Sequence, residues 1–481
     1  MNARTAAAQR PWHLPAYLAG QPLMTERRRE VRYPYDGTLT GSVSLVSLED
    51  VGRAIEAMQA GRQELTRYQR YEILDRTRLL LQERRDEFAD LIRWETGLCQ
   101  RETRYEVGRA QDVLLFAAME ALRDDGQIFS CDISPQGKPR KIFTLREPLQ
   151  MIFAITPFNH PLNQVVHKVA PAIAVGAPIL LKPSEKTPLT ATRFCELLFE
   201  AGLPGSMLSV FAGEVAGVVE PLLADPRIEM VTFTGGTNVG KRIASIAGYK
   251  KLCLELGGNS PLIVLPDADM DLAVELAAEG SYRNSGQRCT AIKRFLVHRE
   301  IADEFTARFV ARTREYVCGD PADEATRVGT VIDEAAAKVL ERRVLLAVDQ
   351  GAKVLVGGQR RGALMEPTVI ADVPRHAEMV CEESFGPLSP ILVVEDLEDA
   401  IKLANSSQYG LSCGVVTQRI DWALECVKKI RTGTVNVNQI PGFRIENSPF
   451  GGIKDSGLGI KEGVIEAMKY MTTVKTFSLP W

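Results

Sequence analysis

The stretch MVTFTGGTNVGK, residues 230–241, passes from an apolar run through two glycines into an amphipathic segment. The apolar run, Met230 to Thr234, has the length of a buried strand, and the segment 237–247 has helical spacing. Backbone N–H groups at the start of such a helix can bind a phosphate. The same glycines would also allow the helix to pack closely on a sheet. The pattern predicts a strand–turn–helix unit and leaves both roles of its glycines open.

Similar strand–helix units lie on both sides of this one. Around it, amphipathic stretches at 161–175, 188–201 and 214–224 alternate with predicted strands at Met151–Thr156, Pro178–Lys182, Met207–Phe211 and Lys251–Leu256. A second alternating set begins at Pro261, with strands at Leu262–Leu265, Phe295–His298, Lys353–Val356, Ile391–Glu395, Leu411–Thr417 and Gly433–Asn438. Such alternation predicts parallel strands joined by right-handed crossovers. The fold class is therefore α/β, with two α/β domains.

Other regions depart from this alternation. Residues 48–96 and Arg101–Leu122 have helical spacing. Residues 125–145 have the pattern of an exposed two-stranded ribbon. The last residues, Met468 to Leu479, alternate Val and Phe with Thr and Lys and predict an edge strand. Because an exposed edge strand needs a cover or a partner chain, we expect a homo-oligomer.

Composition places the chain among ordinary globular proteins. It has 481 residues, enough for two or three domains of ~150 residues each. Its 58 basic and 61 acidic side chains nearly balance, which gives no support for binding to nucleic acid. The longest apolar run, Val169 to Leu181, is interrupted by prolines and falls short of the ~18 residues that a membrane span needs. We therefore expect no nucleic-acid partner and no membrane.

The cysteines and histidines argue against disulfides and metals. Nine cysteines without a CxxC pair indicate reduced thiols and a cytoplasmic protein. The five histidines form no cluster with metal-ligand spacing, so we expect no metal site. Cys195, Cys413 and Cys426 lie on apolar faces and are expected in the core. Cys289 lies instead in the polar segment NSGQRCT, residues 284–290, where it is either a thiolate nucleophile or a buried apolar side chain.

Two acidic positions lie at or just after the ends of predicted strands. Glu255 lies between two leucines and precedes two glycines. An acid in apolar surroundings holds its proton more tightly, which suits a general base, but an edge-strand acid facing solvent is equally compatible with the pattern. Glu185 follows Lys182 in the segment KPSE. This cation and acid form a plausible pair for a cofactor, although charges after a strand are more often simply solvated.

In order and spacing, these motifs resemble those of the NAD(P)-dependent aldehyde dehydrogenase superfamily. The resemblance extends over nearly the whole chain. It is carried by PFN at 157–159, KPSE at 182–185, FTGG at 233–236, LELGG at 254–258, GQRC at 286–289, EESFGP at 382–387 and PFGGIKDSG at 449–457.

The resemblance implies a complete set of catalytic residues. Cys289 would attack the aldehyde, and Asn159 with the Cys289 backbone N–H would stabilise the oxyanion. Glu255 would activate the water that hydrolyses the thioester, and Lys168 would assist proton transfer. A CoA-acylating enzyme would not need Glu255, and a catalytically silent relative would be expected to have lost one of these residues.

The resemblance also implies an NAD(P) site. Lys182 and Glu185 would contact the adenosine ribose, where the acid would repel a 2′-phosphate, so we favour NAD. Many members have Ser at position 236 and Trp at position 158, and this chain has Gly236 and Phe158. The expected cofactor-binding residues are Thr156, Pro157, Phe158, Lys182, Ser184, Glu185, Thr234, Gly235, Gly236, Gly240, Leu256, Gly257, Glu383 and Phe385.

The fold implied by the resemblance is a Rossmann-like cofactor domain, a second α/β catalytic domain and a small β oligomerisation arm. On this chain we expect the NAD-binding domain at 1–124 and 146–254 and the catalytic domain at 255–450. The arm would comprise 125–145 and 451–481. An arm that donates a strand to a partner makes a homodimer or homotetramer natural.

The expected substrate-binding residues are Arg109, His160, Arg288 and Thr290. The two arginines and the histidine make this set unusually cationic. Guanidinium groups suit carboxylate, phosphate or phosphonate. Alternatively, Arg109 pairs with Glu106 or Asp112 on its own helix, and Arg288 points away from the cleft.

Longer segments indicate which members of the superfamily the chain most resembles. Residues 248–265, 283–294 and 451–463 and the ending FSLPW are similar to phosphonoacetaldehyde dehydrogenases, which oxidise phosphonoacetaldehyde to phosphonoacetate during 2-aminoethylphosphonate breakdown. The Arg-before-Cys arrangement is also similar to non-phosphorylating glyceraldehyde-3-phosphate dehydrogenases. We therefore expect a small anionic aldehyde, with glyceraldehyde 3-phosphate, succinate semialdehyde and lactaldehyde as alternatives to phosphonoacetaldehyde.

Overall fold

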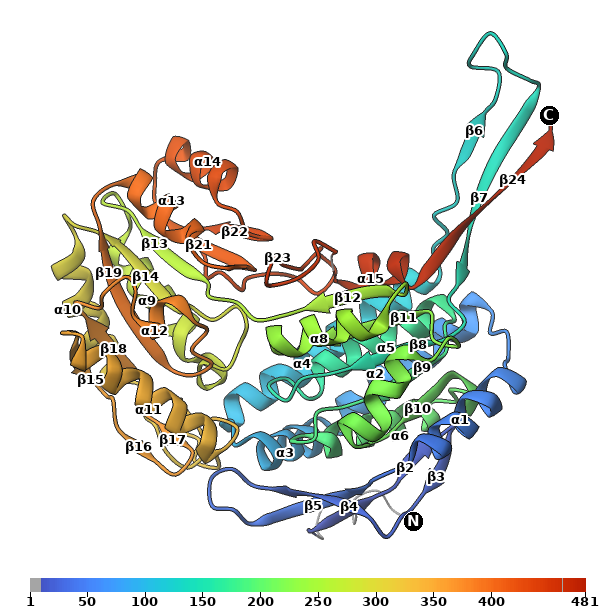
Figure 1. Ribbon diagram of the computed structural model, residues 1–481, viewed down its shortest axis with the longest axis horizontal. Coiled ribbons are helices and arrows are strands. Elements are labelled where there is room, and N and C mark those ends of the chain that lie inside the picture. The colour runs from blue at the N-terminus through green and yellow to red at the C-terminus, as the bar shows by residue number, and fades with distance from the viewer. Residues whose placement is uncertain (1–9, 461) are drawn as a thin grey trace.

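The computed structural model describes residues 10–460 and 462–481. Two seven-stranded sheets lie side by side, and a three-stranded sheet projects from one end of the molecule (Figure 1). A further small sheet near the N-terminus consists of β1 (Trp12–Leu14), β5 (Leu39–Ser44) and β4 (Arg28–Arg32). The two large sheets confirm the predicted α/β class.

The first large sheet has five parallel strands and a terminal hairpin. Its order is β12 (Lys251–Glu255), β11 (Met230–Thr234), β8 (Ile152–Ile155), β9 (Ile179–Lys182), β10 (Leu208–Val210), β2 (Ala16–Leu18) and β3 (Gln21–Leu23). The first five strands are parallel, and β2 runs antiparallel to β10. The strand–helix alternation from residue 150 therefore predicted this parallel core correctly.

Helices cover both faces of the first sheet, because its strands are apolar on both sides. One face packs on α2 (Arg67–Glu83), α3 (Arg85–Thr96), α4 (Gln100–Ala121), α5 (Asn163–Val175) and α6 (Pro188–Glu200). The other packs on α1 (Leu48–Ala60), α7 (Glu220–Ala224) and α8 (Thr237–Ala247). At the start of α1, the Ser47 hydroxyl accepts a hydrogen bond from the Asp50 N–H, which satisfies one of the helix's orphan donors.

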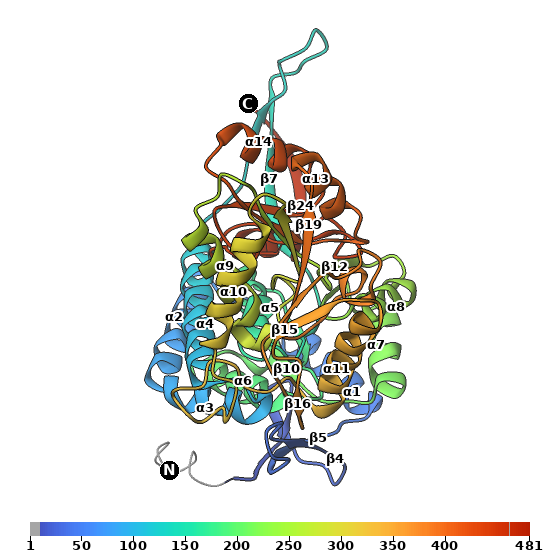
Figure 2. The ribbon, with the colours of Figure 1, turned by 90° about the vertical axis from the view of Figure 1, so that its left-hand side faces the viewer.

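The second large sheet follows the same plan. Its order is β15 (Lys353–Val356), β18 (Thr368–Ala371), β19 (Leu388–Val394), β14 (Arg294–His298), β13 (Pro261–Val264), β21 (Ser412–Val416) and β22 (Thr434–Val437). In Figure 2, α9 (Met270–Tyr282) and α10 (Ala302–Arg314) lie on one side and α11 (Glu334–Asp349) on the other. α12 (Glu378–Cys381), α13 (Leu397–Asn405) and α14 (Ile420–Lys429) complete the α11 side.

The projecting sheet contains β6 (Ile128–Ser130), β7 (Arg140–Pro148) and β24 (Thr472–Pro480), in the order β24-β7-β6 (Figure 1). The predicted ribbon is confirmed, and the C-terminal strand is its third member. That strand begins later than predicted, because residues Val464–Tyr470 form helix α15, which packs on α5. Exposed apolar side chains on this sheet include Phe129, Leu479 and Trp481.

Several details differ from the predicted elements. The helix expected at 214–224 is a π-helical turn, Val215–Val219, followed by the short α7. β15 runs antiparallel to its neighbour β18, a strand that was not predicted. The short hairpins β16 (Arg360–Arg361) with β17 (Leu364–Met365), and β20 (Tyr409–Gly410) with β23 (Ile453–Lys454), were also missed. None of the helices in the described ranges has the length and apolarity of a membrane span.

Candidate active site

A cavity of about 700 Å³ lies between the carboxyl ends of β8, β11 and β12 in the first sheet and the loops that precede β14 and β19 and follow β22 in the second. Its walls bring together most of the residues selected from the sequence. These are Arg109, Pro157, Phe158, Asn159, His160, Thr234, Gly235, Gly236, Glu255, Leu256, Gly257, Arg288, Cys289, Thr290, Glu383 and Phe385. The structure places Thr156, Lys168, Lys182, Ser184, Glu185 and Gly240 outside these walls.

An unusual backbone turn presents Cys289 to the cavity. After α9, Asn284, Ser285 and Gly286 all have positive φ angles, of 58°, 52° and 71°. A Cβ at Gly286 would lie 2.3 Å from the Gly386 carbonyl oxygen, so only glycine fits there. The strained turn redirects the chain so that Cys289 faces the cavity, whereas Cys195, Cys413 and Cys426 are buried in the core as predicted.

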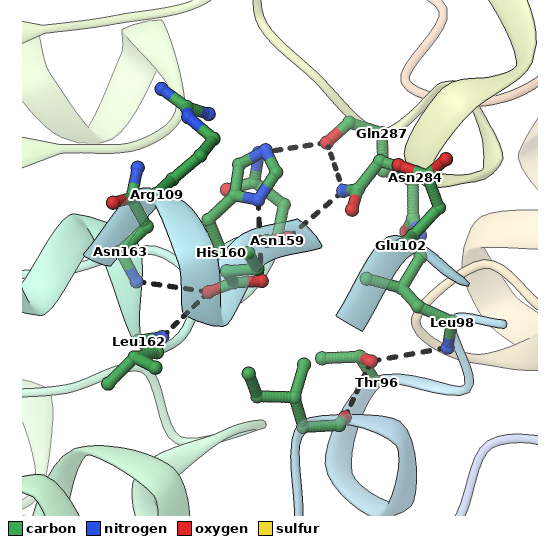
Figure 3. A network of polar contacts seen from close by, with 12 residues as sticks. Thr96, Leu98, Glu102, Arg109, Asn159, His160, Leu162, Asn163, Asn284 and Gln287 are labelled. Carbon is green, nitrogen blue, oxygen red and sulfur yellow. Dashed lines mark hydrogen bonds and ion pairs between the residues drawn. The ribbon is translucent and has the colours of Figure 1, made fainter. Parts of the chain in front are cut away.

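Side-chain amides tie this turn to the loop after β8 (Figure 3). The Asn159 Nδ2 donates to the Gln287 carbonyl at 2.8 Å, and the Asn284 Nδ2 donates to the Asn159 carbonyl at 3.0 Å. The Gln287 Oε1 accepts from the Ile332 N–H at 2.9 Å. Two loops far apart in the sequence are thereby held in one arrangement around Cys289.

The Cys289 thiol is protonated at neutral pH in this arrangement. Burial and the nearby carboxylates of Glu383 and Glu255 raise its pKa to about 11, and the opposing effect of Arg444 and Lys293 is smaller. The thiolate is the nucleophilic form of cysteine. A proton acceptor or an added positive charge is therefore needed before Cys289 can react.

Glu255 ends β12 and is only 4% exposed. The alternative of an acid facing solvent is therefore wrong. Its carboxylate lines the same cavity as Cys289, and its backbone pairs with Gly457 in an isolated β-bridge. A buried carboxylate on a rigid strand end has the position that a general base requires.

Glu383 lies against the glycines that follow Glu255. Its Oε1 accepts from the Gly258 N–H at 3.2 Å, and a Cβ at Gly257 would lie 2.4 Å from its Oε2. Burial raises the pKa of Glu383 and lowers that of the neighbouring Lys293. The fully buried Lys293 donates from Nζ to the Gly286 carbonyl at 2.8 Å, so one ammonium links Glu383 to the Cys289 turn.

The glycines between β11 and α8 have different roles. A Cβ at Gly240 would lie 2.3 Å from Cδ2 of Leu256, and one at Gly235 would lie 2.5 Å from the Phe233 ring. A Cβ at Gly236, the N-cap of α8, would meet no atom within 4 Å. Gly240 therefore allows α8 to pack closely on Leu256, and its contact with a cofactor stays a prediction. Gly236 faces open space.

The remaining predicted cofactor residues surround the ends of β8 and β9. Lys182 is buried at the end of β9, and the Thr156 Oγ1 is buried without a hydrogen-bond partner among the described residues. Glu185 forms an ion pair with Arg29 at 3.3 Å. The Ser184 Oγ accepts from the Lys186 N–H at 3.3 Å. These groups form a polar margin beside the cavity.

Lys168 lies beneath the sheet, away from the cavity. It is fully buried on α5, and its Nζ donates to the Glu462 Oε1 at 2.7 Å and the Thr232 Oγ1 at 2.9 Å. No pattern in the sequence pointed to its pairing with Glu462. Any effect of Lys168 on Cys289 must act through intervening groups.

Both predicted substrate arginines line the cavity. The Arg109 Nε donates to the Glu446 Oε1 at 2.5 Å, so the alternative of a pairing with Glu106 or Asp112 is wrong. The Arg288 Nη2 donates to the carbonyls of Glu279 and Gly280 in α9, at 3.2 and 2.8 Å. Arg288 therefore faces the cavity while its guanidinium is anchored on the helix end.

His160 and Thr290 also lie on the cavity wall. The His160 Nδ1 lies 3.4 Å from the Glu106 Oε2, while the Glu106 Oε1 accepts from the N–H groups of Leu162 and Asn163 (Figure 3). This carboxylate fixes the loop that carries both His160 and Asn159.

Two further arginines of the cavity were missed. Arg444 lies in the loop after β22, 3.9 Å from the Phe450 ring centroid and 3.9 Å from the Glu446 Oε2. Arg283 lies 4.0 Å from the Tyr105 ring centroid and 3.4 Å from the Glu102 Oε2. The loop that carries Arg444 has no regular periodicity, so no local pattern could have shown that it faces Cys289.

Comparison with known proteins decides the class of this site. The sequence model of the Aldehyde dehydrogenase family matches residues 23–477. The chain belongs to the aldehyde dehydrogenase family. This aldehyde dehydrogenase is therefore an oxidoreductase that acts on aldehydes, and the predicted fold and enzyme class are confirmed.

Individual relatives match nearly the full length of this chain. The 3-sulfolactaldehyde dehydrogenase of Priestia aryabhattai is 37% identical over 457 residues, which are 95% of this chain and 96% of the relative. The NADP-dependent glyceraldehyde-3-phosphate dehydrogenase of Bacillus halodurans, solved with NADP, is 33% identical with a TM-score of 0.95, covering 98% and 99% of the two chains. An NAD-dependent aldehyde dehydrogenase of Sinorhizobium meliloti is 31% identical with a TM-score of 0.93, covering 98% and 95%.

Proposed function

We propose that this aldehyde dehydrogenase oxidises phosphonoacetaldehyde to phosphonoacetate with NAD. The observation that carries the proposal is the set of four arginines in the cavity of Cys289 among the described residues, namely Arg109, Arg283, Arg288 and Arg444. Guanidinium groups bind phosphonate oxygens through paired, charge-assisted hydrogen bonds. Each such bond is worth about 1.5–3 kcal/mol, so arginines in a small cavity are sufficient to select an anionic aldehyde.

The first chemical step would be attack of the Cys289 thiolate on the aldehyde carbon. The Asn159 Nδ2 has a second hydrogen besides the one it donates to Gln287, and that hydrogen with the Cys289 N–H would stabilise the oxyanion. Both donors are held by the cross-linked loops before substrate arrives. This pre-organisation is the main contribution that we assign to Asn159.

The second step would be hydrolysis of the thioester on Cys289. Glu255, on the same cavity wall, would take a proton from the attacking water. Lys168 with Glu462 would influence proton movement only indirectly, because the pair lies beneath the sheet. Since a hydrolytic role uses Glu255, we propose carboxylic acid and not a CoA thioester as product.

The residues beside the cavity fit a nicotinamide dinucleotide. The open space at Gly236 and the buried Thr156 Oγ1 leave backbone and hydroxyl groups available to a diphosphate and ribose. When bound, NAD accepts the hydride that leaves the carbonyl carbon. Glu383 would hold the nicotinamide ribose, and Phe385, edge-on to Phe158 at 5.8 Å, would pack beside the ring.

The polar margin beside the cavity, at the ends of β8 and β9, would hold the adenosine half of NAD. We propose that Lys182 and Glu185 contact the ribose hydroxyls and that Glu185 disfavours a 2′-phosphate, hence NAD. Solved relatives include both NAD- and NADP-dependent enzymes, so cofactor choice depends on local residues. We also propose that bound NAD contacts Pro157, Phe158, Ser184, Thr234, Gly235, Leu256 and Gly257.

A sulfonate in place of the phosphonate is a second candidate. It is favoured by the 37% identical relative that is named 3-sulfolactaldehyde dehydrogenase. The two anions have similar shape but differ in charge, because a phosphonate is largely dianionic near neutral pH and a sulfonate is monoanionic.

Initial rates of NADH formation at 340 nm test the proposal. The aldehydes to compare are phosphonoacetaldehyde, 3-sulfolactaldehyde, glyceraldehyde 3-phosphate, succinate semialdehyde and propanal, each with NAD and NADP. We expect the highest kcat/KM with phosphonoacetaldehyde and NAD, and no turnover by Cys289→Ser. A higher kcat/KM with the sulfonate would favour the second candidate, and equal values for all five aldehydes would contradict both.

Assembly and location are part of the proposal. The projecting sheet of β6, β7 and β24, with its exposed apolar side chains, supports an oligomerisation arm and hence a homodimer or homotetramer. We also propose the division into a cofactor domain, a catalytic domain and this arm. All nine cysteines are free thiols, which supports the proposed cytoplasmic location.

A further inference from the structure

A single buried carboxylate lies behind the cavity arginines. Glu446 follows Arg444 in the loop after β22, and its side chain is 6% exposed. It is not part of the cavity wall, but both Arg109 and Arg444 are. A carboxylate placed behind two arginines acts on the charge that these arginines present to a ligand.

The contacts of Glu446 connect three elements. Its Oε1 accepts from the Arg109 Nε of α4 at 2.5 Å, and its Oε2 accepts from the His167 Nε2 of α5 at 2.6 Å. The Arg444 Nη2 lies 3.9 Å from the same Oε2. Because a carboxylate only accepts hydrogen bonds, the His167 proton lies on Nε2.

Glu446 is ionised, and its counter-charges are the arginines. Burial alone would raise its pKa, but His167, Arg109 and Arg444 together lower it below the ordinary value. Burial lowers the pKa of His167, and the Glu446 carboxylate opposes that shift. The negative charge of Glu446 lies directly against Arg109 and near Arg444, the groups expected to contact the substrate anion.

The proposed reaction changes the charge of the bound molecule. Oxidation of an aldehyde, with the new oxygen from water and the hydride transferred to NAD, produces a carboxylate. The product therefore carries one more negative charge than the substrate. In a buried cavity lined by uncompensated arginines, the product would bind more tightly than the substrate, and its release would be slow.

We propose that Glu446 is an internal counter-anion that partly neutralises Arg109 and Arg444, so that the cavity selects an anionic aldehyde but releases the more negative acid. Glu446 touches no reacting atom and is a positioning and specificity-determining residue, not a catalytic one. The inference rests on the proposed anionic substrate. It gives Glu446 a role in product release, in addition to its structural contacts.

Product inhibition of the full-length enzyme tests this role. Glu446→Gln keeps the shape and the acceptor for the Arg109 Nε but removes the charge. We expect the Ki of phosphonoacetate to fall at least tenfold, with kcat reduced and with the KM of propanal changed less than threefold. Glu446→Asp keeps the charge, and its Ki should stay within threefold of wild type.

Glu83→Gln is the matched control. Glu83 is exposed at the end of α2 and is not part of the cavity wall, so this variant makes the same chemical change away from the cavity arginines. Its Ki for phosphonoacetate should equal that of wild type. An unchanged or higher Ki in Glu446→Gln, or the same fall in Glu83→Gln, would overturn the inference.

A measurement on the wild-type enzyme covers the case in which Glu446→Gln does not fold. The inference predicts a Ki for phosphonoacetate that is no lower than the KM of phosphonoacetaldehyde, despite the extra charge of the product. A Ki more than tenfold below that KM would overturn it. If wild type shows no preference for phosphonoacetaldehyde over propanal, the proposed function itself fails, which is a separate outcome.

Discussion

The side-chain amide of Asn159 donates a hydrogen bond to the backbone carbonyl of Gln287 at 2.8 Å. This contact joins the loop after β8 in the first sheet to the Cys289 turn before β14 in the second. The proposed oxyanion donor and the proposed nucleophile are therefore held relative to each other by the protein alone. Pre-organised donors of this kind are the largest single source of stabilisation in many acyl-transfer sites.

Asn159→Ala should lower kcat by about 10²–10³-fold, because one oxyanion donor is lost. The KM of NAD should change little, since Asn159 is not among the residues proposed to hold the cofactor. Steady-state rates at 340 nm and a melting curve measure both effects. A fall in kcat below tenfold in a variant that melts like wild type would remove Asn159 from the oxyanion site.

Gly286→Ala should destabilise the protein, because Gly286 has φ = 71° and a Cβ there would lie 2.3 Å from the Gly386 carbonyl oxygen. Strain of this kind costs about 1–3 kcal/mol, and the collision adds to it. Gly459→Ala is the matched control, since Gly459 also has positive φ, at 78°, but open space around it. Urea unfolding should show the larger loss for Gly286→Ala, and equal losses would disprove the close approach.

The alkylation rate of Cys289 should rise with pH across the neutral range. Its pKa is raised to about 11 by burial and neighbouring carboxylates, so below that pH the thiolate fraction grows about tenfold per pH unit. Mass spectrometry after timed iodoacetamide treatment of the cofactor-free enzyme at pH 7, 8 and 9 measures this rate. A rate that is constant over this range would mean that the thiol is already ionised at pH 7.

Lys293→Met should weaken NAD binding and lower kcat. The buried ammonium donates to the Gly286 carbonyl and is the main positive charge near Glu383, so its loss raises the pKa of Glu383 further. More of Glu383 is then protonated at pH 7, and the KM of NAD should fall back toward wild type as pH rises. Lys428→Met, on the exposed side of α14, is the control. A KM for NAD without this pH dependence would separate Lys293 from Glu383.

Local sequence patterns were sufficient for most strands of the two large sheets, and the family resemblance supplied most cavity residues. Glu255 could be placed at the end of β12, because ligands lie at the carboxyl ends of parallel strands. The short N-terminal strands, β18 and the two small hairpins were not predicted, since strands of two to six residues carry little periodicity. β15 was predicted as a strand, but its antiparallel direction was not.

The contacts on the substrate side of the site could not be predicted from the sequence. Arg109 was selected for the substrate anion, with a pairing on its own helix as the alternative, but its partner Glu446 is 337 residues away in the chain. Arg444 and Glu446 lie in an irregular loop, where only the tertiary fold decides direction. The packing role that was left open for the glycines of residues 235–240 is filled by Gly240, which approaches Leu256.

The selectivity of wild type and of Arg288→Ala for phosphonoacetaldehyde over propanal tests the central claim most directly. If the cavity arginines bind the phosphonate, wild type should prefer phosphonoacetaldehyde to propanal at least a hundredfold in kcat/KM. That ratio corresponds to ~2.7 kcal/mol of transition-state binding. Arg288→Ala should lose at least tenfold of that preference, through a raised KM for the phosphonate alone. Equal changes for both aldehydes, or no preference in wild type, would contradict the account.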